Sequence, residues 1–182
     1  MLTFLKYLIQ LILSPSNGWD DLAKHDPDPE VMLREGLFPL MALSAATEFL
    51  DIPYGTDAGL LQVISSAVTD LGAYFLTVFL ARLIFDISLD KLCDRPPEQR
   101  RVHTFINATV GLMVLFRIVD NCLPWNLMLL KFLPLYVVLV ISKATRYVGI
   151  RRRDDMEFLG IASGVTVAVP LCIYYLIYLL IR

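Results

Sequence analysis

Long hydrophobic blocks alternate with short polar segments along the chain. Five blocks approach or exceed the roughly 20 apolar residues that a helix needs to cross about 30 Å of hydrocarbon. They are Gly36–Ile52, Leu60–Leu89, His103–Asp120, Asn126–Ser142 and Phe158–Ile181. The pattern therefore predicts an all-α fold, an integral membrane bundle of five transmembrane helices.

Three residues predict where the first of these helices begins. Asp28, Pro29 and Glu30 have the residue types of an N-cap, a first helical position and an acidic first turn. A helix from Pro29 to Asp51 would be about 34 Å long, which is enough to cross a bilayer.

The hydrophobic N-terminal stretch, residues 1–14, is too short to span. Its polar residues Thr3, Lys6 and Gln10 share one helical face, which predicts an amphipathic helix lying in the membrane interface. We expect residues 15–35 to form a cytoplasmic linker and the start of the first span, and residues 36–181 to form the five-span bundle. Residues 1–182 are then a single membrane domain.

Lysine and arginine gather in alternate loops. Most of the 16 basic residues lie before the first span, between the second and third, or between the fourth and fifth. These residues are Lys6, Lys24, Arg34, Lys91, Arg95, Arg100, Arg101, Lys143, Arg146, Arg151, Arg152 and Arg153. Because positively charged loops stay on the cytoplasmic side, the N-terminus is predicted to be cytoplasmic and the C-terminus outside.

Several ionisable residues fall inside the predicted spans, where each should face the bundle and find a partner. The topology places one group near the outer face: Glu48, Asp51, Asp70, Arg117, Asp120 and Lys131. This group is either a polar cavity for a cation, proton or small solute, with Asp70 as its deepest acid, or a buried ion-pair network that holds the helices in register.

A second polar group is predicted near the inner face. It consists of Arg82, Asp86, His103, Asn107 and Lys143. Arg82 and Asp86 lie four residues apart on one helical face and could pair with each other. In the last span, Gly160 and Gly164 have the spacing that lets helix backbones approach closely, either within the bundle or in a dimer.

Composition agrees with a membrane protein and narrows the chemistry. Hydrophobic residues make up 57% of the chain and charged residues only 19%, against about 45–50% and about 25% in soluble domains. The net charge of −2 does not favour nucleic-acid binding. Common catalytic and nucleotide-binding motifs are absent, and two histidines without a cysteine pair do not suggest zinc. We therefore expect no enzymatic activity, no cofactor and no metal site.

The organisation resembles the Yip family of five-span membrane proteins, named for interaction with Ypt/Rab small GTPases. Pro15 and Trp19, in the segment LILSPSNGWDDLAKHDPDPE, fall where bacterial members have a proline and an aromatic residue. The resemblance implies a compact prokaryotic-type member in a bacterial inner membrane. The Asp-Leu-Tyr-Gly-Pro motif of eukaryotic members is absent, so small-GTPase binding is not expected to carry over.

Two functions remain open at this point. The first is non-enzymatic: organisation of the membrane, or recruitment of partners at the cytoplasmic face, with membrane lipid, other membrane proteins or further copies of the chain as partners. The alternative is a component of a transporter or channel for a small solute, ion or proton, which would use the outer charged group.

Overall fold

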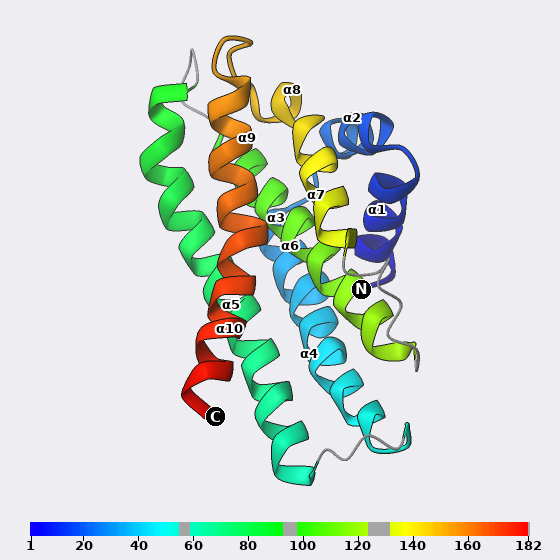
Figure 1. Cartoon of the computed structure of the whole chain (residues 1–182). Coiled ribbons are helices and arrows are strands. Elements are labelled where there is room, and N and C mark those ends of the chain that lie inside the picture. The colour runs from blue at the N-terminus through cyan, green and yellow to red at the C-terminus, as the bar shows by residue number, and fades with distance from the viewer. Residues whose placement is uncertain (55–58, 93–97, 124–131, 182) are drawn as a thin grey trace.

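The chain folds into a helical bundle (Figure 1). The structure is a computed structural model and describes residues 1–54, 59–92, 98–123 and 132–181. Its helices are α1 (Leu2–Leu13), α2 (Pro15–His25), α3 (Pro29–Val31), η1 (Met32–Leu37), α4 (Phe38–Thr47), η2 (Glu48–Asp51), α5 (Leu60–Leu92), α6 (Gln99–Cys122), α7 (Leu133–Ser142), α8 (Thr145–Val148), α9 (Asp155–Ser163), η4 (Gly164–Ala168) and α10 (Val169–Ile181). The predicted all-α fold is confirmed for the residues described.

The long helices run in alternating directions around α6 (Figure 1). Helix α4 descends to the end of the bundle where α5 begins, α5 returns to the end where α6 begins, and α9 begins at that same end. Helix α6 contacts α1, α4, α5, α7 and α8, and most of its side chains are buried. The aromatic core lies against it, where Phe85, Phe105 and Phe158 pack together.

The helical run from Pro29 to Asp51 begins as predicted. The Asp28 carboxylate accepts a hydrogen bond from the Glu30 backbone N–H at 2.9 Å, and Pro29 occupies the first turn. This satisfies a backbone donor that helix formation leaves without an intrahelical partner.

Two π-helical segments interrupt the regular helices, and each ends two residues before a proline. Segment η1 precedes Pro39 and η4 precedes Pro170. The N–H of the residue between segment and proline bonds five residues back, to the carbonyl of Leu33 in one case and Gly164 in the other. Because proline cannot donate to the carbonyl four residues earlier, a π-turn is one way to reorganise the hydrogen bonds around it.

The N-terminal helix packs against the bundle, a contact that the sequence did not predict. Phe4, Leu8 and Leu11 of α1 are buried against the bundle, so this part of its apolar face meets protein. The amphipathic pattern itself is correct, since Thr3 and Lys6 are exposed. Leu2 and Leu13 remain 84% and 80% exposed, so α1 keeps an apolar surface that an interfacial position would bury in lipid.

Helix α2 completes a hairpin with α1 that is fastened to the bundle. Trp19 is only 2% exposed and donates from Nε1 to the Val140 carbonyl at 2.9 Å. Tyr136 of α7 donates to the Ile12 carbonyl at 2.6 Å. Residues 15–25 are therefore a docked helix and not a loose linker.

Within the described ranges, three helical segments are long and apolar enough to cross a membrane, where five were expected. They are Leu60–Leu89, Gln99–Cys122 and Asp155–Ile177. The run from Pro29 to Asp51 carries Glu30, Arg34 and Glu35 near its start, so its apolar part is shorter than the helix. Helix α7 has only 10 residues, and residues 124–131 of the fourth expected span lie outside the described part.

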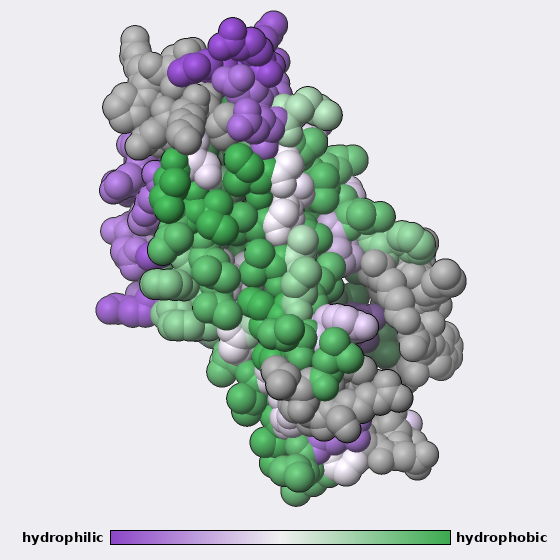
Figure 2. Space-filling view, turned by 60° about the vertical axis from the view of Figure 1, so that its left-hand side comes forward, coloured by the Kyte–Doolittle hydropathy of each residue, from purple (hydrophilic) through white to green (hydrophobic). Residues whose placement is uncertain are grey.

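A hydrophobic band covers the middle of the face formed by α5 and α10 (Figure 2). Hydrophilic residues gather at the end of this face where α9 begins. On the face formed by α5 and α10, large side chains such as Leu61, Phe79 and Tyr175 are more than half exposed. An apolar surface of this extent is typical of a protein surrounded by lipid or by other membrane proteins.

Candidate functional site

The centre of the candidate site is Arg117 of α6, which pairs with two buried carboxylates from other helices. Its Nη2 and Nε lie 2.8 and 3.1 Å from Glu48 Oε1, and its Nε lies 3.4 Å from Asp70 Oδ1. Glu48 is 5% and Asp70 3% exposed. Arg117 therefore connects η2, α5 and α6 through charge-assisted contacts in a place that water scarcely reaches.

Four neutral or partly exposed groups complete this charge cluster. Ser44 donates to Asp70 Oδ2 at 2.6 Å, and Asn121 donates to Glu48 Oε1 at 2.7 Å. The Arg117 guanidinium lies 5.1 Å from the ring centroid of Tyr174, and Nη2 donates to its hydroxyl at 3.3 Å. Asp120 lies at the rim, 3.8 Å from Arg117 Nη1.

Of the predicted outer group, the structure brings together Glu48, Asp70, Arg117 and Asp120. Asp51 lies in η2, three residues beyond Glu48, and Lys131 lies outside the described residues. The neutral side chains that hydrogen-bond to the carboxylates were not predicted from the sequence, although the spacing of two of them along the chain could have indicated them. Ser44 and Asn121 each lie four residues from a member of the cluster, and hence on the same helical face.

In this arrangement the charged groups of Arg117, Glu48 and Asp70 bind one another. Both oxygens of Asp70 have a partner, and Glu48 Oε1 accepts from Arg117 and Asn121. The geometry is that of an ion-pair network joining helices, the second of the two interpretations that the sequence left open. Because removing one partner would leave a buried charge uncompensated, the network holds the helices in one relative position.

The inner polar group assembles differently from the sequence prediction. Arg82 pairs with Glu30 of α3 at 3.1 Å rather than with Asp86 on its own helix. The expected pairing was wrong because the start of α3 brings a carboxylate from another helix to Arg82. His103 lies within electrostatic range of Arg82, Asp86 and Glu30.

Asn107 and Lys143 have separate roles. Asn107 is fully buried and donates from Nδ2 to the Pro29 carbonyl at 2.8 Å, which ties α6 to the start of α3. Lys143 is an exposed residue at the C-terminal end of α7. Among the residues described, no ion pair joins Lys143 to the inner group.

Gly160 and Gly164 are not at a close helix–helix contact. A Cβ atom added at either position would meet no atom within 4 Å. The expected backbone approach inside the bundle is therefore wrong. Close contacts occur at other glycines, among them Gly36 and Gly111, where an added Cβ would lie 2.5 and 2.7 Å from atoms of the Phe4 ring.

No group of three or more His, Cys, Asp or Glu side chains in the described ranges is placed to hold a metal ion. Comparisons with protein-family models, with curated proteins and with solved structures found no match to this chain.

Proposed function

We propose that this chain is a non-enzymatic, multi-pass membrane protein of the Yip type, which organises the membrane or recruits partners at its cytoplasmic face. The observation that carries this proposal is the pairing of Arg117 with Glu48 and Asp70. Ion pairs between helices fix the relative positions of those helices, which suits a rigid scaffold. A transport pathway would instead need such groups to face a passage.

The course of the chain supports five crossings. Helices α6 and α8 both adjoin α2: Arg100 of α6 pairs with Asp26, which caps α2, and α8 packs on α2. We infer that the chain crosses back between Cys122 and α8, in a span that contains α7 (Figure 1). The run from Pro29 to Asp51 supplies the fifth, with its charged residues at the interface.

The proposed contact surface is the end of the bundle formed by α2, α8 and the start of α9. Arg146, Arg152 and Arg153 are exposed there. Because Trp19 and Tyr136 fasten the α1–α2 hairpin, this surface is presented on a rigid support. Exposed arginines suit anionic lipid headgroups and acidic segments of partner proteins. We place this end in the cytoplasm, at a bacterial inner membrane.

Cross-linking in native membranes followed by co-purification tests the recruitment proposal. We expect Arg152→Gln/Arg153→Gln to lose cross-linked partners that the parent retains. Lys6→Gln, a loss of exposed positive charge on α1, should keep them. Identical partner sets in all three proteins would contradict recruitment at this surface.

A flux assay in liposomes tests the transporter alternative. The parent and Asp70→Asn should both be silent for protons, sodium and potassium. Flux in the parent that disappears in a folded Asp70→Asn protein would replace our proposal with transport through the charge cluster.

A further inference from the structure

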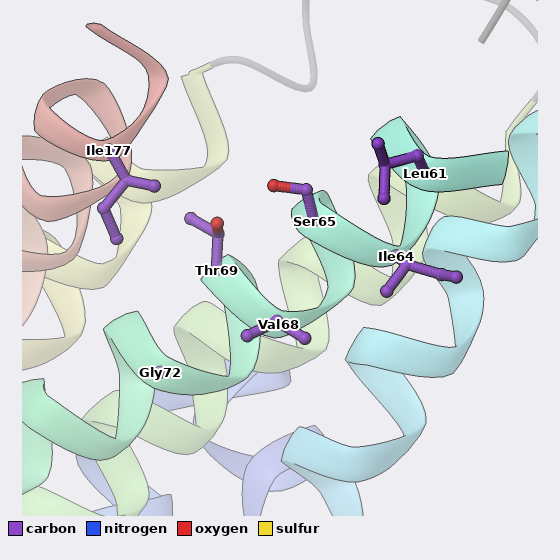
Figure 3. Close-up of a pocket in the computed structure, with 7 residues that line it drawn as sticks. All are labelled: Leu61, Ile64, Ser65, Val68, Thr69, Gly72 and Ile177. Atoms are coloured by element: carbon purple, nitrogen blue, oxygen red, sulfur yellow. The ribbon is translucent and has the colours of Figure 1, made fainter. Parts of the chain in front are cut away.

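A groove runs between α5 and α10 on the apolar face of the bundle (Figure 3). Its volume is about 510 Å³, and it is lined by Leu61, Ile64, Ser65, Val68, Thr69, Gly72 and Ile177. Nothing lies within 4 Å of the place where a Cβ of Gly72 would be. The groove is therefore wide enough for a chain-like ligand and open to the surroundings of the protein.

The groove contains two hydroxyl groups without protein partners. In the part of the chain that the structure describes, Ser65 and Thr69 make no side-chain hydrogen bond. Elsewhere in the long helices Thr77, Thr109 and Thr166 each donate to the carbonyl four residues earlier. Ser65 and Thr69 instead point towards the side of the groove where Ile177 lies (Figure 3). A hydroxyl in an apolar medium is stabilised by an acceptor, so the occupant should supply one.

The height of these hydroxyls along α5 indicates which acceptor is near. Asp86 is an exposed acid towards the other end of the same helix. The 21 residues from Ser65 to Asp86 correspond to a rise of about 31 Å, close to the roughly 30 Å of bilayer hydrocarbon. With Asp86 at one boundary, Ser65 lies at the other, at the level of the lipid ester groups.

We propose that the groove binds one phospholipid of the leaflet nearest the N-terminus of α5. An acyl chain lies between α5 and α10, and its ester carbonyl accepts hydrogen bonds from Ser65 and Thr69. A phospholipid presents an apolar chain and a carbonyl acceptor together, whereas the backbone carbonyls of a second copy of this chain are used within its helices. The inference rests on the proposed membrane embedding but not on which face is cytoplasmic.

Photolabelling in liposomes tests this proposal. The probe is phosphatidylglycerol with a diazirine near the ester end of one acyl chain, in phosphatidylethanolamine vesicles. We expect the label on the peptides that carry Ser65–Gly72 and Ile177, at least fivefold weaker in Gly72→Leu, which fills the groove. Gly160→Leu is the matched control, because its Cβ also enters open space but outside the groove.

The hydroxyl contact has a separate test. Ser65→Ala/Thr69→Ala should lower the label several-fold, whereas Ser163→Ala, which removes a hydroxyl bonded to its own helix, should not. Equal labelling of the parent and Gly72→Leu, or cross-links between two copies at these residues, would overturn the lipid site. If Gly72→Leu loses the label but Ser65→Ala/Thr69→Ala keeps it, the ester contact is overturned. Absence of label also from exposed Leu83 and Ile87, which lie near the opposite ester level, would contradict embedding itself.

Discussion

Arg117 shows how one side chain can bring three helices together. It is a guanidinium with several donors in a fixed plane, and it reaches Glu48, Asp70 and Tyr174 at once. A lysine would offer one compact charge and could not stack on the tyrosine ring in the same way. The identity of this residue therefore matters as much as its charge.

Loss of Arg117 should destabilise the fold strongly. Arg117→Gln leaves two carboxylates buried without their counter-charge, so we expect the free energy of unfolding to fall by about 3 kcal/mol. Denaturation of the protein in mixed detergent micelles measures it.

Two further variants locate the effect. Glu48→Gln in the Arg117→Gln background should recover part of the loss, because one uncompensated charge disappears. Asp120→Asn, at the exposed rim, should change stability by less than about 1 kcal/mol. Strict additivity of Glu48→Gln and Arg117→Gln would show that the two residues are not coupled.

The burial of Tyr147 in α8 predicts that the free energy of unfolding falls at high pH. Burial raises its pKa to about 12 from an ordinary value of 10. The unfolded chain therefore loses this proton first, and stability that is complete below pH 10 falls as the pH rises from about 10 to about 12.

Tyr147→Phe should reduce this alkaline loss. The Tyr147 hydroxyl is buried beside Thr104 but makes no hydrogen bond of ordinary geometry among the residues described, so removing it should not destabilise the protein at pH 7. Thermal unfolding of both proteins between pH 7 and pH 11 provides the comparison. Parallel pH profiles would contradict the assignment to Tyr147.

At the scale of elements, the docking of α1 depends on glycines in its neighbours. The Phe4 ring lies against Gly36 of η1 and Gly111 of α6, at positions where any larger residue would collide with it. The π-turn of η1 also sets the direction in which α4 continues beyond Pro39. A helix of 12 residues is thereby built into the bundle through shape, in addition to the hydrogen bond from Tyr136 to the Ile12 carbonyl.

Filling one glycine position should loosen α1. A Cβ in Gly111→Ala would lie 2.7 Å from Phe4 Cζ, so we expect a loss of about 1–3 kcal/mol and faster proteolysis between α1 and α3. Gly160→Ala, in open space, should be neutral or slightly stabilising. Phe4→Leu in the Gly111→Ala background should recover stability, and failure to do so would argue against a collision with this ring.

At the scale of the whole molecule, the alternation of helices predicts where the two ends of the bundle lie. Cys122 at the end of α6 is exposed, and Arg153 before α9 is 86% exposed in its side chain. Five crossings place these residues on opposite sides of the membrane, whereas crossings by the three long apolar segments alone would place them on the same side.

Thiol labelling distinguishes these topologies. In a background with Cys93 and Cys172 replaced by serine, a membrane-impermeant reagent should label Cys122 in intact cells. In Cys122→Ser/Arg153→Cys, the new thiol should react only after the membrane is opened. Labelling of both positions from outside would rule out the return of the chain through α7.

Local patterns were sufficient to predict much of this architecture. The length of the hydrophobic blocks predicted the long helices, and Asp28-Pro29 predicted a helix start. Polar residues spaced three and four apart predicted the polar face of α1. These features depend on interactions within a few residues, which repeat along any helix whatever surrounds it. The grouping of Glu48, Asp70 and Arg117 followed as well, because each lies at a similar height in its helix.

Contacts between helices required the folded arrangement. Helix rotation and relative height decide that Arg82 meets Glu30 and not Asp86, that Phe4 fits against glycines, and that Trp19 is buried. These choices arise from packing between residues that are distant along the chain, and several arrangements satisfy the same hydrophobic pattern. Local sequence thus indicates that a helix has an apolar face, while only the surrounding helices decide whether protein or lipid covers it.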